Sequence, residues 1–361
     1  MCAVEDIFSS LGEVELVEGR GLRSEQLEGV DVLLVRSVTR VDDELLADHP
    51  LRFVGSATSG IDHVDTQALA RRDIPFAYAP GANADSVVDY VISAIANCSD
   101  MLEQLLAGAE VGIVGYGHVG RRLGERLQAL HIRSRICDPL LEGAGLPELN
   151  SLEDVLTCPV VCLHAELTRS PPWPSYHLVD ASCLPLLRDG ALLINAGRGE
   201  LIDTSDLIAW LRGAPTVELV LDVWEGEPRI NTRLLARCRY GTPHIAGYSY
   251  DGKLRATHML YLALCKSLGA AAFKRQAPIE PLPVSVPSHL EGAALLRWLM
   301  AKVYDIRDDD LRMRGAMPDG FDELRRNYPR RRELGSVQVS NAGQLSEHAL
   351  EMCRALGCRG V

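Results

Sequence analysis

The sequence predicts an α/β protein that contains two parallel β-sheets with helices packed on them. Two series of short β-rich segments alternate with helical segments, one within the first 80 residues and one between residues 111 and 223. Strands of the second series are apolar without strict alternation, which is typical of strands covered on both faces in a doubly wound sheet. A Gly-x-Gly-x-x-Gly pattern directly follows the first strand of that second series.

The composition excludes several classes of protein. The 361 residues carry a net charge of −12 and only 5% aromatic side chains, which disfavours binding to nucleic acid or to an anionic membrane. No apolar segment approaches the ~18 residues that a membrane span needs, and the first residues lack the features of a signal peptide. The ten cysteines include no Cys-x-x-Cys pair, so we expect free thiols in a cytoplasmic protein and no metal site.

The first series predicts a small parallel sheet. Helix-start chemistry at residues 42–46 and 64–69 separates its strands. A segment without glycine or proline, residues 86–106, places its apolar side chains on one face, so we expect one long helix that connects two domains. The expected strands of the first series are residues 14–17, 32–36, 52–57 and 75–78.

The second series predicts the larger, doubly wound sheet. Its helices include residues 121–130 and a helix capped at Asp203 that runs to about Leu211. The expected strands are residues 111–114, 135–137, 160–163, 191–194 and 218–223.

The last third of the chain predicts a change of domain. A helix over residues 252–272 is followed by a proline-rich linker over residues 276–287. Beyond the linker we expect a helix (293–304), a basic stretch, a strand (337–340) and a final helix (346–356).

The glycine pattern predicts a dinucleotide site. Gly115 permits a tight turn after the strand, Gly117 permits close approach of a pyrophosphate, and Gly120 permits close packing of helix and strand. Asp138 ends the next strand, where a carboxylate accepts hydrogen bonds from the adenosine ribose. Because this anion repels a 2′-phosphate, we expect NAD rather than NADP. A tight structural turn is the alternative explanation for an isolated glycine pattern.

Three ionisable residues follow three successive β-rich segments, at the edge of a parallel sheet where ligands bind. His244 can exchange a proton with a substrate hydroxyl, and Glu227 can orient the imidazole and favour its protonated form. Arg198 can grip a carboxylate with two hydrogen bonds. Asp222 is placed to accept from a nicotinamide carboxamide. Each residue alone fits an ordinary surface or loop role, but together they favour oxidation of a 2-hydroxy acid.

Three segments resemble a known family. Residues 195–199, 222–228 and 243–247 resemble the signature motifs of D-isomer-specific 2-hydroxyacid dehydrogenases. The resemblance implies a doubly wound NAD domain inserted in a smaller flavodoxin-like substrate domain. It also implies that Arg198, Glu227 and His244 are catalytic, with His244 as the proton donor.

One branch of this family resembles nearly the whole chain, through residues 35–39, 53–63, 81–83, 247–249, 304–310 and 324–329. This implies oxidation of a phosphorylated four-carbon 2-hydroxy acid with NAD, in vitamin B6 biosynthesis. The implied substrate contacts are Ser37, Thr58 and Tyr248. The implied cofactor contacts are Asp138, Ala165, Asp222 and Gly247, beside Gly115, Gly117 and Gly120.

The same resemblance divides the chain into three domains. It implies a substrate domain from residues 1–90 and 247–280, an NAD domain from residues 91–246, and a C-terminal α+β dimerisation domain from residues 281–361. The protein is therefore expected to be a homodimer. The C-terminal extension sets this branch apart from other members of the family.

The chain departs from the family pattern at two places. The family opens with a strand that this chain does not supply, so we expect either that the start has been assigned too late or that the small sheet lacks its first strand. Where the family has His-Thr-Pro-Leu, this chain has His164, Ala165, Glu166 and Leu167, so we expect weaker NAD binding.

A cluster of arginines lies in the C-terminal domain. With the net charge of −12, we interpret it as dimer-interface ion pairs rather than a nucleic-acid patch, and we hypothesise that one member reaches the phosphate site of the partner. The cluster comprises Arg325, Arg326, Arg330, Arg331 and Arg332.

Two alternative functions stay open at this point, beside the possibility of a non-functional truncated copy. The first is a relaxed-specificity D-2-hydroxyacid dehydrogenase acting on glyoxylate or hydroxypyruvate, against which the extension at residues 288–361 argues. The second is a non-catalytic NAD-binding sensor, against which the complete set of Arg198, Glu227 and His244 argues.

Overall fold

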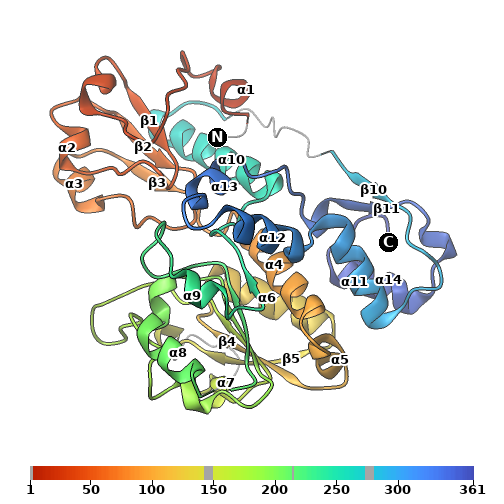
Figure 1. Ribbon diagram of the computed structural model, residues 1–361. Coiled ribbons are helices and arrows are strands. Elements are labelled where there is room, and N and C mark those ends of the chain that lie inside the picture. The colour runs from red at the N-terminus through yellow and green to blue at the C-terminus, as the bar shows by residue number, and fades with distance from the viewer. Residues whose placement is uncertain (1–2, 142–148, 214, 273–279) are drawn as a thin grey trace. The chain divides into compact units, whose positions relative to one another are not determined.

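The computed structural model describes residues 3–141, 149–213, 215–272 and 280–361, and its chain forms two compact units (Figure 1). Unit 1 comprises Met1–Asn83 and Ser249–Glu280, and unit 2 comprises Ala84–Tyr248 and Pro281–Val361. Parallel sheets with helices on their faces confirm the α/β fold class. The C-terminal residues belong to the same compact unit as the glycine motif and the candidate catalytic residues.

Unit 1 contains a three-stranded parallel sheet in the order β1-β2-β3. Helices α2 and α3 cover one face of the sheet, and α1 and α10 cover the other (Figure 1). Aspartates 42 and 65 cap α2 and α3 by accepting backbone N–H bonds. The elements are α1 (Val4–Phe8), β1 (Val32–Val35), α2 (Asp43–Leu46), β2 (Phe53–Ser56), α3 (Thr66–Arg71), β3 (Phe76–Tyr78) and α10 (Tyr250–Leu268).

The expected strand at residues 14–17 is wrong. These residues carry no strand assignment, and Leu16 is 61% exposed. β1 is hydrogen-bonded to β2 on one side, and no strand of the described residues pairs with its other side. Since an extended segment becomes a strand only through a ladder with a neighbour, the β-rich composition of residues 14–17 is not sufficient to form one.

The single long helix expected over residues 86–106 is also wrong. The structure has two helices, α4 (Ala84–Asn97) and α5 (Met101–Leu106). Ser99, between them, adopts a φ of 36°, and its hydroxyl donates to the Glu218 carboxylate. The positive φ of Ser99 breaks the helical path, and its bond to a side chain 119 positions away holds the break in place.

Unit 2 is built on a six-stranded parallel sheet in the order β5-β4-β6-β7-β8-β9. Alternate side chains of each strand point to opposite faces. Ile113, Cys162 and Ile194 pack with α4, α5 and α6, whereas Val161 and Leu193 pack with α7, α8 and α9. The strands are β4 (Glu110–Val114), β5 (Arg133–Cys137), β6 (Val160–Leu163), β7 (Leu192–Asn195), β8 (Glu218–Leu221) and β9 (Tyr240–Gly241). The remaining helices are α6 (His118–Ala129), α7 (Leu152–Leu156), α8 (Thr204–Leu211) and α9 (Thr232–Leu235).

The C-terminal segment packs directly on this sheet layer. Helix α11 lies against α4, and α12 lies against β9. Within the expected linker, residues 276–279 lie outside the described residues, but residues 282–284 form a strand that pairs with β11. The elements are β10 (Leu282–Val284), α11 (Gly292–Val303), α12 (Ile306–Ala316), α13 (Phe321–Arg326), β11 (Val337–Val339) and α14 (Glu347–Ala355).

Short 3₁₀ helices connect several of these elements. They are Ser24–Leu27, Pro139–Leu141, Leu184–Leu186, Gly199–Leu201, Leu334–Ser336 and Ala342–Gln344. In the described part of the chain, no helix is both long and apolar enough to cross a membrane. Nor do the described residues gather three metal-ligating side chains at one place, and their nine cysteines are free thiols.

Arg331 joins the C-terminal segment to α4. Its side chain is buried, donates to the carbonyl oxygens of Ser86 and Ala246 at 2.6 Å and 3.1 Å, and lies 3.6 Å from the ring centroid of Tyr304. Arg331 therefore binds within its own chain, and the expectation that it serves a dimer interface is wrong. A guanidinium over an aromatic face gains a favourable cation–π contact.

Asp89 of α4 lies in the same buried region. It accepts a hydrogen bond from the Leu334 N–H at 2.9 Å. Burial, and secondarily the charge of Glu333, raises the pKa of Asp89 from 3.8 to about 7. Folding therefore favours the protonated carboxyl, and this stabilisation is lost as the pH rises from about 4 through about 7.

The first prediction concerns this buried carboxyl. Asp89→Asn mimics the protonated form, so its stability relative to the parent protein should be greater at pH 8 than at pH 5 by about 3 kcal/mol. Urea unfolding of both proteins at the two pH values measures the difference. Asp31→Asn, at an exposed position, should show no such pH dependence. An equal stability difference at pH 5 and pH 8 would contradict the prediction.

Candidate active site

The glycine loop between β4 and α6 adopts a conformation that larger residues could not adopt. Gly115 has a φ of +88°, and a Cβ there would stand 2.4 Å from the Ala165 backbone nitrogen. A Cβ on Gly120 would stand 2.1 Å from the Gly115 carbonyl oxygen. A Cβ on Gly117 would have no neighbour within 4 Å. The loop therefore leaves open space at the N-terminus of α6, which suits a pyrophosphate.

Asp138 lies at this same loop. One carboxylate oxygen accepts from the Tyr116 N–H at 2.7 Å, and the other accepts from the Leu140 N–H at 3.2 Å. Arg135, in the middle of β5, pairs with Glu110 at the start of β4 rather than with Asp138. Among the described residues, no arginine forms an ion pair with Asp138, which fits a ribose with free hydroxyls.

The three candidate catalytic residues come from loops that follow adjacent strands of one sheet. Arg198 follows β7, Glu227 follows β8 and His244 follows β9. Since all strands are parallel, these loops share the carboxyl edge of the sheet. Arg198 donates to the Gly197 carbonyl at 2.9 Å, and its own carbonyl accepts from the Asn195 amide at 2.9 Å. These bonds fix the loop that carries the guanidinium.

Asp222 organises the loop that carries His244. Its carboxylate accepts three hydrogen bonds, from the Thr242 hydroxyl at 2.7 Å and from the N–H groups of Ile245 and Ala246 at 2.8 Å and 2.9 Å. The Asp222 carbonyl accepts a fourth bond, from the His244 N–H at 2.7 Å. Asp222 is 1% exposed. The expected cofactor contact is therefore also the residue that fixes the backbone on both sides of His244.

His244 and Glu227 form the central pair of the site. The His244 Nδ1 lies 2.7 Å from the Glu227 Oε2, and the Glu227 Oε1 accepts from the Trp224 N–H at 2.9 Å. With Nδ1 bonded to a carboxylate, Nδ1 carries the hydrogen and Nε2 is the atom that can take or give a proton. His244 has a φ of 55°, a left-handed conformation that the bonds to Asp222 hold in place.

Glu227 remains ionised because its partners outweigh its burial. Burial raises the pKa of Glu227, and the charge and hydrogen bond of His244 lower it. The Trp224 N–H and the charge of Arg325 lower it further, so the net pKa is below the usual value. A carboxylate at this position orients the imidazole and stabilises its charged form.

Tyr248, an expected substrate contact, lies beside the C-terminal segment. Its hydroxyl is 3.2 Å from the Arg325 Nη2, and its ring packs edge-to-face on Tyr328 at 5.8 Å. The sequence offers no signal for this contact, because Tyr248 and Arg325 lie 77 positions apart.

Ser37 and Thr58 belong to unit 1, where they follow β1 and β2. Ser37 is exposed, whereas the Thr58 hydroxyl donates to the Gly60 carbonyl at 2.7 Å and lies 2.6 Å from the Ser56 hydroxyl. Both residues sit at the carboxyl edge of the small parallel sheet, the edge at which parallel sheets bind ligands. The other expected site residues lie in unit 2.

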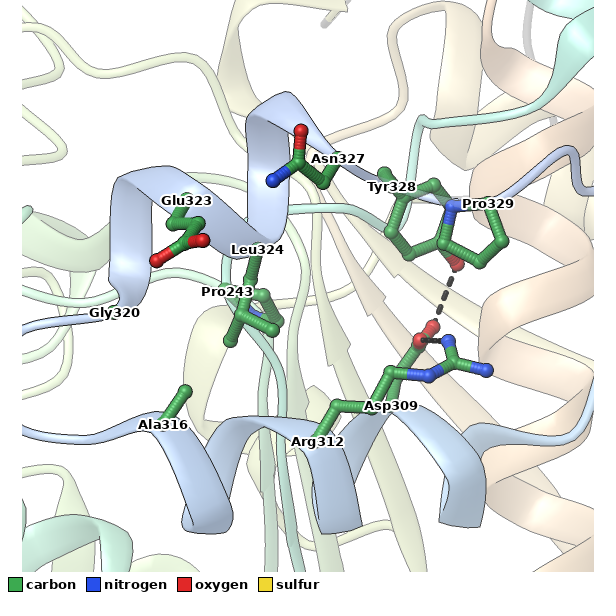
Figure 2. A pocket seen from close by; sticks show the side chains of 10 residues that line it. All are labelled: Pro243, Asp309, Arg312, Ala316, Gly320, Glu323, Leu324, Asn327, Tyr328 and Pro329. Carbon is green, nitrogen blue, oxygen red and sulfur yellow. Dashed lines mark hydrogen bonds and ion pairs between the residues drawn. The ribbon is translucent and has the colours of Figure 1, made fainter.

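A cavity of about 240 Å³ opens between α12 and α13, next to Pro243 (Figure 2). Arg198, Glu227 and His244 do not line it. Figure 2 shows Tyr328 of its wall bonded to Asp309, and Asp309 paired with Arg312. The cavity is therefore distinct from the proton-transfer pair, although the residue preceding His244 contributes to its wall.

Comparison with known families agrees with this geometry. Residues 90–246 match the NAD-binding domain of the D-isomer specific 2-hydroxyacid dehydrogenases, and residues 279–357 match a domain of unknown function (DUF3410). The cofactor is accordingly NAD.

Curated relatives extend the match to nearly the full chain. An erythronate-4-phosphate dehydrogenase of Cellvibrio japonicus is 42% identical over 99% of this chain and 97% of the relative. This chain belongs to that enzyme family. The enzyme of the same name from Edwardsiella ictaluri is 44% identical over 93% of this chain and 91% of its own.

Solved structures share the fold. A 3-phosphoglycerate dehydrogenase of Entamoeba histolytica superimposes with a TM-score of 0.63 at 21% identity, covering 76% of this chain and 93% of that one. A D-lactate dehydrogenase of Aquifex aeolicus superimposes with a TM-score of 0.56 at 21% identity, covering 69% and 86%. At this identity the likeness shows the fold alone.

The second prediction separates the roles of two loop glycines. Gly120→Ala forces a Cβ against the Gly115 carbonyl, so it should lower the free energy of unfolding by about 1–3 kcal/mol. It should also raise the dissociation constant of NADH about tenfold or more. Gly117→Ala meets no neighbour, so it should weaken NADH binding with no change in stability.

Urea unfolding and fluorescence titration with NADH measure both effects. If the Gly120→Ala variant bound NADH as tightly as the parent protein, this result would contradict the loop geometry. A loss of stability in Gly117→Ala equal to that in Gly120→Ala would contradict the assignment of open space at Gly117.

Proposed function

We propose that this protein catalyses NAD-dependent oxidation of 4-phospho-D-erythronate to (R)-3-hydroxy-2-oxo-4-phosphooxybutanoate, a step of pyridoxal 5′-phosphate (vitamin B6) biosynthesis. The names of the full-length relatives support this substrate. The observation that carries the chemistry is the bond between His244 Nδ1 and Glu227 Oε2 at 2.7 Å. This bond occupies Nδ1 and leaves the imidazole Nε2 as the nitrogen that can act as a base.

His244 is the proton acceptor in this proposal. The Nε2 atom takes the proton of the substrate 2-hydroxyl during oxidation and returns it in the reverse reaction. Glu227, ionised and fixed by the Trp224 N–H, stabilises the imidazolium that forms. Bound NAD supplies the hydride acceptor. Arg198 binds the substrate carboxylate and withdraws charge from the adjacent carbon.

The remaining contacts of the proposal follow the expected residues. Ser37, Thr58 and Tyr248 bind the substrate. Gly115, Gly117, Gly120, Asp138, Ala165, Asp222 and Gly247 bind NAD; the open space at Gly117 and the carboxylate at Asp138 support this assignment.

The domain roles also belong to the proposal. Residues 1–90 and 247–280 bind the substrate, residues 91–246 bind NAD, and residues 281–361 form a dimerisation domain in a cytoplasmic homodimer. The match of residues 279–357 to a separate domain model supports a distinct C-terminal module. The comparisons do not favour a relaxed-specificity dehydrogenase or a non-catalytic sensor, because the full-length relatives carry the name of one specific enzyme.

The third prediction is the activity itself. Purified protein should form NADH with 4-phospho-D-erythronate in the presence of a carbonyl trap, and less with erythronate or 3-phospho-D-glycerate. His244→Ala should lower kcat about 10²–10⁴-fold, because it removes the proton acceptor. NADH absorbance follows the reaction. Equal turnover of all three acids would indicate a relaxed dehydrogenase. Folded protein that binds NADH without turnover would indicate a sensor.

A further inference from the structure

The short helix α13 brings a positive charge to the proton-transfer pair. Arg325 donates to the Tyr248 hydroxyl oxygen at 3.2 Å, and its guanidinium lies 5.7 Å from the Tyr248 ring centroid and 5.9 Å from that of Phe321. Its charge also acts on Glu227, the partner of His244. All of these residues lie in unit 2, so one compact unit carries the arrangement.

The protein uses only part of the hydrogen-bonding capacity of Arg325. Its Nε is buried and finds no hydrogen-bond partner among the described residues. The bond that Arg325 does form goes to a neutral hydroxyl. A buried guanidinium N–H without an acceptor is costly, and an anionic ligand would supply the acceptor. Arg331, six positions along the chain, also has a buried Nε without a partner among the described residues, but its two terminal nitrogens both donate to backbone carbonyl oxygens.

The terminal nitrogens of Arg331 therefore find backbone acceptors, whereas Arg325, among the described residues, donates only to the Tyr248 hydroxyl. Tail contacts hold α13 in place: Phe321 is buried, and Tyr328 donates to Asp309 of α12 at 2.6 Å (Figure 2). The position of Arg325 is thus fixed by its own chain.

We propose that Arg325 binds the phosphate group of the substrate and sets the preference for a phosphorylated acid. This inference rests on the proposed function. The substrate has two anionic ends, and Arg198 is assigned to the carboxylate, so the phosphate needs a cation of its own. A guanidinium matches phosphate oxygens with charge-assisted hydrogen bonds. Arg325 is hydrogen-bonded to Tyr248, which is an expected substrate contact. In this proposal Arg325 is therefore next to the substrate as well as near the His244–Glu227 pair.

Three variants test the proposal. Arg325→Gln removes the charge, Arg325→Lys keeps the charge without the planar fork, and Arg354→Gln changes an exposed arginine of α14 as a matched control. The measurements are kcat and KM for 4-phospho-D-erythronate and for unphosphorylated erythronate, each over a range of pH. Turnover of 4-phospho-D-erythronate by the parent protein is established first, and its absence would refute the proposed function rather than this inference.

The expected result is a selective loss. Arg325→Gln should lower kcat/KM for the phosphorylated acid about 10- to 100-fold, mainly through KM. It should change kcat/KM for erythronate less than about threefold, a limit set by the loss of a weak hydrogen bond to a neutral hydroxyl. Arg325→Lys should give an intermediate loss, and Arg354→Gln should behave as the parent protein. Equal losses on both acids, or a shifted pH profile with no change in preference, would overturn the proposal in favour of a positioning role through Glu227.

A mixing experiment tests whether Arg325 acts on its own chain. Arg325→Gln and His244→Ala chains are co-expressed with different tags, and the mixed species is purified. If Arg325 served the partner's site, one site of the mixed species would hold both residues and recover activity on the phosphorylated acid. Because Arg325 contacts Tyr248 of its own chain, no recovery above the separate variants is expected. Recovery would overturn the same-chain assignment.

Discussion

The buried carboxylate of Asp222 is the constraint on which the site depends. It binds the Thr242 hydroxyl and two backbone N–H groups that follow His244, so the left-handed backbone at His244 is held from both sides. The Tyr90 hydroxyl donates in turn to Thr242 at 2.8 Å. A chain of buried hydrogen bonds therefore runs from helix α4 through Asp222 to the loop of the proton-transfer residue, and such a network stabilises one conformation only when every member is satisfied.

The C-terminal segment extends this constraint. Arg331 binds the carbonyl of Ala246, the residue whose N–H binds Asp222, and Asp310 accepts from the Gly241 N–H at 2.8 Å. The loop that carries His244 is thus held by the sheet on one side and by the C-terminal segment on the other. This explains in physical terms why residues 281–361 pack in the same compact unit as the NAD domain.

The sequence predicted the parts of the molecule that depend on local chemistry. The glycine loop, the strand ends and the cap at Asp203 follow from residue type and spacing. The other features depend on contacts between segments that are distant in the sequence. Residues 14–17 lack a ladder partner, and Ser99 breaks a helix through a bond to Glu218. The contact of Arg325 with Tyr248 joins distant segments, for which a single sequence offers no periodic signal.

The most direct test of the central role of Asp222 is a crystal structure of the Asp222→Asn variant. An asparagine keeps one acceptor oxygen but presents an NH₂ donor to backbone N–H donors, so one of the bonds to Ile245 or Ala246 must break. We expect the His244 backbone to leave φ near 55° and its Nδ1 to separate from Glu227 beyond hydrogen-bond distance. An unchanged loop, with the bond between His244 and Glu227 intact, would contradict the central role of Asp222.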